Sequence, residues 1–460
     1  MAEAGATLLD RTLRRLRRGW HELSLSGPRS LADTLSRKLD GADLARVRSA
    51  VTDCLEGRGG EVSALSRAAA LGEAYLILDA TGRGRFLNLL ATEFGCDRTQ
   101  VDAAAQALLS ARDGDRAGAE RALRMALSPP RFALFRQLGA LPQGVKFLVE
   151  LRAELERLSL DEDVRRSLSE ELRDLLSSWF DYGFLELRRI TWASPADLLE
   201  RLMAYEAVHE IRSWTDLKNR LDSDRRCFAF FHPRMPGEPL IFIEVALTSG
   251  LADSVEALLD ETAAATDPAQ ADTAIFYSIS NAQRGLAGIS FGGFLIKRVV
   301  DLLRAEFPKL KTFATLSPMP EFRAWLADCV ATAPKSIAAL VSDDDIAVLR
   351  ETLDRNWPAN PEQVAALREP LVRLGAHYLL AEKRNGRASD PVAHFHLSNG
   401  ARVERLNFLA DRSPKGMRES AGLMVNYLYK LDEIEANHEA YGAEGKIRAS
   451  SQLRGLAKGS

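Results

Sequence analysis

The chain has 460 residues, of which 46% are hydrophobic and 27% charged, and its formal net charge is -3. This length exceeds the size at which one hydrophobic core keeps growing, so we expect two domains that each bury a core of their own. The nearly balanced charge gives no reason to expect nucleic acid or an acidic membrane surface as partner. No apolar run approaches the roughly 20 residues of a membrane-spanning helix, so no membrane span is expected.

The four cysteines, Cys54, Cys96, Cys227 and Cys329, lie far apart and form no short-spaced pair. Zinc sites and disulfide frameworks are recognised by closely and regularly spaced cysteines, so neither is indicated here. The cysteine pattern is therefore typical of a protein in a reducing compartment.

The N-terminal part has a helical pattern from about residue 30 to 190. Apolar residues recur at spacings of three and four, and strand-like alternation is almost absent. Val145–Leu158 shows this clearly, because its apolar residues form one stripe and its charged residues the opposite face. We predict an all-α helical bundle as the first domain, residues 1–190.

After Trp192 the pattern changes to short β-rich runs separated by helical stretches. These runs are Cys227–Phe231, Leu240–Leu247, Ala274–Ser280, Thr312–Leu316 and Phe395–Leu409. Their mixed spacing favours a mixed sheet over a regular doubly wound one. We predict an α/β domain over residues 191–460.

Ala274–Pro318 is predicted to be a β-loop-α-β unit, with its helix over Phe294–Phe307. Glycines at 285, 288, 292 and 293 precede this helix, where backbone N–H groups and the helix dipole can meet a phosphate, and Lys297 adds charge. The spacing fits neither a Walker loop nor a Rossmann fingerprint, which disfavours ATP and NAD. The alternative is a turn with close helix-to-sheet packing and no ligand.

The loop Gln283–Gly292 resembles the coenzyme A (CoA) pyrophosphate loop of the GNAT acyltransferase superfamily. Further segments before and after this loop resemble the malonyl-CoA decarboxylase family in particular, and they occur in the same order as that family's motifs. The segments that carry this resemblance are Tyr205–His209, Pro236–Leu240, Phe276–Ser280, Leu316–Pro320, Phe395–Ala401 and Gly422–Tyr427. The resemblance implies a GNAT-like catalytic domain behind the helical domain.

The family resemblance also implies the site residues. A serine in the Ser-Pro segment and a histidine in the His-Leu-x-Asn-Gly segment are the family's catalytic pair, and they fall on Ser317 and His396. The predicted CoA-binding residues are Gly285, Ala287, Gly288, Ile289, Ser290, Phe291, Gly292, Gly293 and Lys297. Family members carry Gln at Ala287 and Glu at Ser290, so contacts from those two side chains are not implied here.

Asn399-Gly400 lies between two alternating runs and is a strong signal for a two-residue β-hairpin turn. The resulting register places His396 opposite Val403 and His394 opposite Arg405 on one polar face. Arg405, His394, Asn407 and Tyr427 are the predicted supporting residues. A metal site at the His-x-His pair is the alternative, but no carboxylate or cysteine stands at ligand spacing and Arg405 would repel a cation.

The implied reaction converts malonyl-CoA to acetyl-CoA and CO₂. The thioester can hold the resulting enolate, so no metal, biotin or pyridoxal phosphate is expected. His396, changing charge near neutral pH, would protonate the enolate, while Ser317 would hydrogen-bond the substrate. Two alternatives stay open: a CoA-dependent N-acyltransferase, and a non-catalytic CoA-sensing scaffold.

Two further expectations concern assembly and location. The resemblance implies a homo-oligomer, such as a tetramer, with the helical domain mediating self-association. The chain ends Ala-Lys-Gly-Ser, without the peroxisomal Ser-Lys-Leu of some relatives, so a cytoplasmic location is expected.

Overall fold

The structure, a computed structural model, describes residues 16, 19, 20, 23, 30–56, 60–180, 182–289, 295–353 and 357–458. It divides into two compact units. The first consists of Met1–Leu185, Phe231–Pro239 and Gln283–Phe291, and the second of Glu186–Phe230, Leu240–Ala282 and Gly292–Ser460. The first unit thus contains two short segments from the second half of the sequence.

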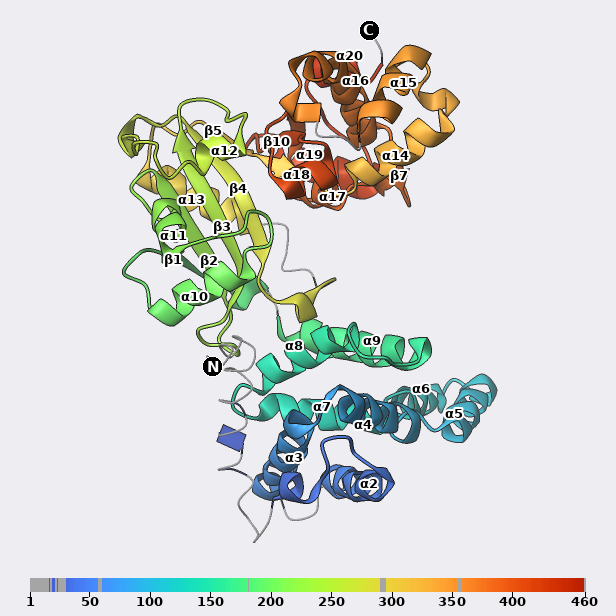
Figure 1. Cartoon of the computed structure of the whole chain (residues 1–460). Coiled ribbons are helices and arrows are strands. Elements are labelled where there is room, and N and C mark those ends of the chain that lie inside the picture. The colour runs from blue at the N-terminus through green and yellow to red at the C-terminus, as the bar shows by residue number, and fades with distance from the viewer. Residues whose placement is uncertain are drawn as a thin grey trace. The chain divides into compact units, whose positions relative to one another are not determined.

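The N-terminal part of the first unit is helical, as predicted, and is drawn in blue to teal in Figure 1. Its α-helices are α2 (Gly41–Leu55), α3 (Gly60–Ile77), α4 (Ala80–Glu93), α5 (Arg98–Ser110), α6 (Arg116–Ala126), α7 (Pro130–Ala140), α8 (Gly144–Leu155) and α9 (Glu162–Trp179), joined by 3-10 helices η1 (Leu31–Thr34) and η2 (Tyr182–Phe184). Aspartates cap several of them: Asp79, Asp97 and Asp161 each accept a hydrogen bond from backbone N–H groups at a helix start.

Helix α8 packs against α7 and α9. The predicted apolar stripe is confirmed, since Val145, Leu148, Leu151 and Leu155 are buried. Lys146, expected on the polar face, is only 3% exposed. Its ammonium group is hydrogen-bonded to the carboxylate of Glu150 at 2.6 Å, which is the kind of partner that a buried charge requires.

The second unit contains a mixed sheet in the order β1-β2-β3-β4-β5-β10-β6, with β9 pairing to β10. The strands are β1 (Glu186–Ile190), β2 (Arg225–Phe231), β3 (Pro239–Thr248), β4 (Thr273–Asn281), β5 (Thr312–Thr315), β6 (Ser317–Pro318), β9 (Arg402–Asn407) and β10 (Met424–Leu428). β4 and β5 are parallel, whereas β3–β4 and the pairs of β10 are antiparallel. β7 (Lys383–Arg384) and β8 (Arg387–Ala388) form a separate ribbon.

The helices of this unit are α10 (Ala196–Tyr205), α11 (Trp214–Arg220), α12 (Val255–Leu258), α13 (Leu295–Glu306), α14 (Phe322–Thr332), α15 (Asp343–Thr352), α16 (Pro361–Leu380), α17 (Pro391–Ser398), α18 (Pro414–Ser420), α19 (Ile434–Glu444) and α20 (Ser451–Leu456), with 3-10 helices η3 (Pro268–Gln270), η5 (Lys335–Ile337) and η6 (Trp357–Ala359). α13 crosses between the parallel strands β4 and β5 (Figure 1), as the predicted β-loop-α-β unit requires. Its apolar side, including Val299, Val300 and Leu303, is fully buried.

The predicted hairpin at Asn399-Gly400 is wrong. Residues 391–398 form helix α17, and only Arg402–Asn407 is a strand, β9. β9 pairs with β10 instead, so His396 does not face Val403 across a ladder, nor His394 Arg405. Gly400 has the expected positive φ of 82°, but this conformation ends a helix here.

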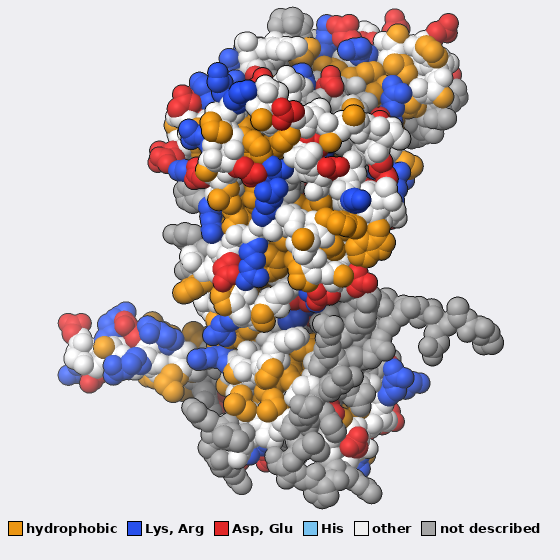
Figure 2. Space-filling view, turned by 90° about the vertical axis from the view of Figure 1, so that its left-hand side faces the viewer, with side chains coloured by type: hydrophobic (Ala, Val, Ile, Leu, Met, Phe, Trp, Pro, Cys, Tyr) orange, Lys and Arg blue, Asp and Glu red, His pale blue; other side chains and the backbone are white. Residues whose placement is uncertain are grey.

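The predicted fold class, an all-α part followed by an α/β part with a mixed sheet, is confirmed. In the part of the chain that the structure describes, we find no helix with the length and apolarity needed to cross a membrane. Basic and acidic side chains are interspersed over the described surface in Figure 2.

Candidate active site

Ser317 and His396 lie in hydrogen-bond contact although they are far apart in sequence. The serine Oγ is 3.1 Å from His396 Nε2. Ser317 stands at the start of β6, where it pairs with Val425 of β10, and His396 is in the last turn of α17. Asp390 and Pro391 define the start of this helix, because the Asp390 carboxylate accepts from the N–H groups of Val392 and Ala393.

The other ring nitrogen of His396, Nδ1, is 2.8 Å from the hydroxyl of Tyr429. Ser317 Oγ donates to Thr315 Oγ1 at 2.9 Å. A hydroxyl has a single proton to donate, so this assignment makes Nε2 the protonated nitrogen and Tyr429 the donor to Nδ1. A chain of hydrogen bonds therefore runs from Tyr429 through the imidazole of His396 to Ser317 and then to Thr315.

The histidine is 3% exposed, and burial lowers its pKa to about 3. The imidazole is therefore neutral at physiological pH, and the expectation that it changes charge near neutral pH is wrong. Burial also raises the pKa of Tyr429 well above its usual value, so its hydroxyl keeps its proton. The site thus has a neutral imidazole and a neutral phenol as its potential proton donors.

Tyr427, predicted as a supporting residue, stacks on the imidazole with ring centroids 4.6 Å apart and planes 26° apart. Asn426 lies next to it and is fully buried. Its amide nitrogen donates to the backbone oxygen of Thr315 at 2.8 Å. The Tyr427 N–H donates to Thr315 Oγ1 at 3.2 Å. β10 therefore fixes both the ring plane of His396 and the strand that carries Ser317.

The pair faces a pocket of about 240 Å³ in the second unit. The pocket is formed by β3, β4, β6, the first residues of α13 and one side of α17. Its apolar walls are Val208, Ile241, Ile243, Phe276, Ile279, Leu295, Ile296, Pro318, Pro391, Val392 and Phe395. Its polar residues are Tyr277, Asn281, Ser317 and His396, and none of the described lining residues carries a formal charge at neutral pH.

Three of the predicted supporting residues make contacts elsewhere. Arg405 Nε donates to Asn426 Oδ1 at 3.0 Å, and its guanidinium also binds the backbone oxygens of Leu251 and Ala252. Asn407 donates to the same Asn426 oxygen at 2.9 Å. His394 Nδ1 is 2.9 Å from the hydroxyl of Tyr441. These side chains stabilise β9, β10 and α17 and do not contact Ser317 or His396.

The predicted CoA loop is described only in part. Gly285, Ala287, Gly288 and Ile289 lie in the first unit, in and after η4 (Arg284–Leu286), whereas Ser290, Phe291, Gly292 and Gly293 lie outside the described residues. Lys297, in α13, has its ammonium group 3.5 Å from Glu435. Gly288 has a φ of 75° with open space where a Cβ would stand.

Gly285 packs closely against α8. A Cβ at this position would stand 1.8 Å from the backbone oxygen of Val149 in α8. The missing side chain thus permits close packing of the loop on a helix of the first unit. This packing is between the loop and a helix, whereas the alternative predicted for these glycines was close helix-to-sheet packing. Gly288 is exposed.

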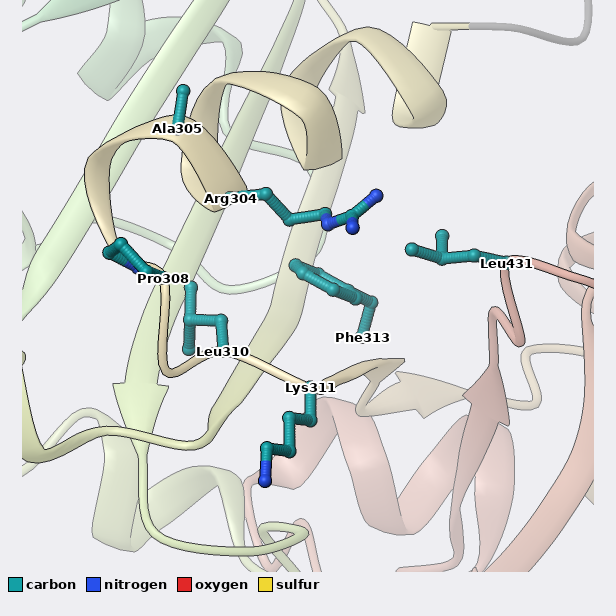
Figure 3. Close-up of a pocket in the computed structure, with 7 residues that line it drawn as sticks. All are labelled: Arg304, Ala305, Pro308, Leu310, Lys311, Phe313 and Leu431. Atoms are coloured by element: carbon teal, nitrogen blue, oxygen red, sulfur yellow. The ribbon is translucent and has the colours of Figure 1, made fainter.

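A larger hollow of about 560 Å³ lies at the other end of α13 (Figure 3). It is lined by Arg304, Ala305, Pro308, Leu310, Lys311, Phe313 and Leu431. The Arg304 side chain extends toward Leu431, while Lys311 points away from it (Figure 3). These two charged groups do not converge, and the lining contains neither a histidine nor a hydroxyl group, so the smaller pocket is the better candidate for chemistry.

A buried serine–histidine pair at an apolar pocket is a candidate site for an enzyme that acts on a small organic group. Comparison with known proteins gives the family. The malonyl-CoA decarboxylase C-terminal domain model matches residues 183–460, and the N-terminal domain model of the same family matches residues 94–180. The chain therefore belongs to the malonyl-CoA decarboxylase family, and the predicted enzyme class, a carboxy-lyase, is confirmed.

Individual relatives agree with this assignment. The mitochondrial malonyl-CoA decarboxylase of Anser anser anser is 40% identical over 397 residues, which cover 81% of this chain and 79% of the relative. The malonyl-CoA decarboxylase structure from Rhodopseudomonas palustris has 43% identity and a TM-score of 0.83 over 89% of this chain and 99% of that one. The structure from Agrobacterium vitis has 41% identity and a TM-score of 0.82, with the same coverage.

Proposed function

We propose that this chain converts malonyl-CoA to acetyl-CoA and CO₂ with Ser317 and His396 at the reacting group. The observation that carries this proposal is the buried contact of Ser317 Oγ with His396 Nε2 at the edge of an apolar pocket. The predicted absence of a metal, biotin or pyridoxal phosphate stays a prediction. Its chemical basis is that a thioester carbonyl can itself hold the electron pair left by CO₂.

The apolar pocket favours loss of the carboxylate. A malonyl carboxylate in this pocket would lose its hydration, and none of the described lining residues offers a cation to replace it. The departing CO₂ is neutral, and the negative charge moves to the thioester oxygen. The environment therefore disfavours the charged starting group more than the neutral product.

Protonation of carbon 2 is assigned to His396. As the C–C bond breaks, its electron pair forms the enolate. Ser317 stabilises the enolate by turning its hydroxyl from Thr315 Oγ1 to the enolate oxygen. Carbon 2 then takes the proton from His396 Nε2, while Nδ1 takes the hydroxyl proton of Tyr429. Solvent then returns one proton to Nε2 while Nδ1 gives its proton back to Tyr429, which restores the starting tautomer. The reaction therefore consumes one proton for each CO₂ released.

Incubation of the purified protein with malonyl-CoA as sole substrate tests this proposal. Acetyl-CoA and CO₂ are expected in equal amounts without any amine acceptor. A product that forms only when an amine is added would favour the N-acyltransferase alternative. No turnover together with tight CoA binding would favour the CoA-sensing scaffold, and either result would overturn the decarboxylase proposal.

The oligomeric state and the location are part of the same proposal. We propose a homo-oligomer in which the helical part mediates self-association. We also propose the cytoplasm as its location, supported by four free cysteines, which are typical of a reducing compartment. Fractionation of cells that express the full chain tests the location, and recovery in an organelle would contradict it.

A further inference from the structure

The described part of the CoA loop is held by α8 through three contacts, all within the first unit. Gln283, at the start of the loop, accepts a hydrogen bond from the ammonium group of Lys146 at 2.7 Å and donates to the backbone oxygen of Pro239 at 2.9 Å. Gly285 packs against the backbone oxygen of Val149. The third contact is made by Arg152.

Arg152 binds the loop backbone directly. Its Nη1 donates to the backbone oxygens of Gly285 at 2.7 Å and Ala287 at 2.8 Å. Its Nε donates to the backbone oxygen of Ser169 in α9 at 3.2 Å, which fixes the guanidinium between helix and loop. A guanidinium presents several donors in a rigid plane, so one arginine can orient two peptide groups at once.

The orientation of these carbonyls determines the direction of the next N–H groups. In a planar trans peptide, the C=O and the following N–H point in opposite directions. The Gly285 carbonyl is followed by the Leu286 N–H, which donates to Gln283 within η4. The Ala287 carbonyl is followed by the Gly288 N–H, which donates to no acceptor among the described residues. Gly288 is exposed, and no atom of the described residues lies within 4 Å of where its Cβ would stand.

We propose that Arg152 is a positioning residue for CoA: by holding the Ala287 carbonyl, it aims the Gly288 N–H outward to donate to a phosphate oxygen of the CoA diphosphate. This inference rests on the proposed function, because it takes the loop to be the CoA site. The helical part of the chain thereby contributes to substrate affinity in addition to any role in assembly. Arg152 itself does not contact the ligand, and it acts through the loop backbone.

Calorimetric titration with CoA compares the wild type with Arg152→Ala and Arg152→Lys. We expect the Kd for CoA to rise about tenfold in Arg152→Ala, in line with the loss of an oriented, charge-assisted contact. The lysine variant keeps the charge but not the two-carbonyl geometry and should be intermediate. Arg83→Ala is the matched control, since Arg83 pairs with Glu154 of α8 and none of its hydrogen bonds to described residues reaches the loop.

Turnover of malonyl-pantetheine, which lacks the diphosphate, separates positioning from damage to the fold. In Arg152→Ala, kcat/KM should fall about tenfold for malonyl-CoA and stay within about twofold of wild type for malonyl-pantetheine. An equal loss for both substrates, an unchanged CoA Kd, or the same loss in Arg83→Ala would overturn the inference. A wild type that binds CoA without releasing CO₂ would refute the proposed reaction while leaving the Arg152 test valid.

Discussion

Among the described residues, the imidazole of His396 has two neutral hydrogen-bond partners, Ser317 and Tyr429, and no carboxylate partner. In a hydrolytic triad an acidic residue stabilises the imidazolium that forms when the histidine accepts a proton. With a phenol in that position and a pKa of about 3, His396 does not hold two ring protons at neutral pH, so Nε2 can give its proton to carbon 2 only as Nδ1 takes one from Tyr429. That fits a reaction in which a carbanion-like group must be protonated.

Removal of either member of the pair tests the assignment at the residue level. Ser317→Ala and His396→Ala should each lower kcat for malonyl-CoA by about 10²–10⁴-fold, the usual range for a lost acid–base group. The double variant should be little worse than the more damaged single one, because groups that act as a unit are not additive. His394→Ala is the control on the same helix and should keep kcat within a few-fold. A double variant whose losses multiply would argue against a coupled pair.

Tyr429→Phe removes one hydroxyl group and keeps the buried ring. We expect kcat to fall about 10- to 100-fold with KM little changed, because the phenol donates to the imidazole and does not contact the CoA loop. Steady-state kinetics measures both constants. Tyr441→Phe, which removes the hydroxyl bonded to His394, is the matched control. Equal kinetics of the Tyr429 variant and wild type would refute the proton path through this residue.

Glu244, on β3, is buried, and this burial and the Glu206 carboxylate raise its pKa to about 7 despite the nearby Arg220 guanidinium. The unfolded value is about 4.3, so folding takes up a proton between these two pH values. Glu244 therefore stabilises the fold fully below about pH 4, and this contribution is lost as the pH rises through 7. Urea unfolding should show Glu244→Gln gaining stability relative to wild type from pH 5 to 8. A difference that stays constant with pH would contradict the raised pKa of Glu244.

At the level of elements, the sequence predicted the central strands β2, β3 and β4 within two residues at each end. Their fully buried apolar runs are bounded by turn residues, which makes them easy to locate. The strand prediction for the segment around His396 was wrong because Asn-Gly is compatible with both a hairpin turn and a helix end. The Asp390-Pro391 helix start, nine residues before Asn399-Gly400, was the signal that could have decided for a helix.

Only those residues of the proposed site that lie in recognisable sequence motifs were predicted. Ser317, His396 and Tyr427 belong to motifs, and the structure brings them together. Tyr429 and Thr315 were missed because they act through contacts between distant segments, which no local pattern encodes. The alternation 425, 427, 429 in and after β10 was the only sequence signal pointing to Tyr429.

Gly285→Ala tests the packing of η4 on α8. The added methyl group would stand 1.8 Å from the Val149 backbone oxygen, so loop or helix must move. We expect KM for malonyl-CoA to rise several-fold and the free energy of unfolding to fall by about 1–3 kcal/mol, the usual cost of overpacking. Denaturant unfolding and steady-state kinetics measure both. Gly118→Ala in α6, where the methyl meets nothing within 4 Å, should show neither loss. If Gly285→Ala changed neither KM nor the free energy of unfolding, the packing of η4 on α8 at this glycine would not be what holds the loop.

On the scale of the whole molecule, α5 and α6 have no buried residues and pack mainly on each other. Leu109 and Met125 are 88% and 77% exposed, which makes this pair of helices a candidate self-association surface. Light scattering of the wild type should give a multiple of 50.7 kDa, and Leu109→Glu with Met125→Glu should lower that mass. Glu120→Gln, an exposed change on the same helix, is the control. A measured mass of 50.7 kDa for the wild type would show a monomer and contradict the proposed oligomer.

The make-up of the first unit has a consequence for synthesis on the ribosome. This unit includes Phe231–Pro239 and Gln283–Phe291, so its helices lack two of their packing segments until residue 291 has been made. At roughly 5–20 residues per second, the helical part spends several seconds with the apolar sides of α8 and α9 incompletely covered. During that interval the nascent chain is exposed to misassembly with its neighbours, and a nascent-chain chaperone would act most usefully there.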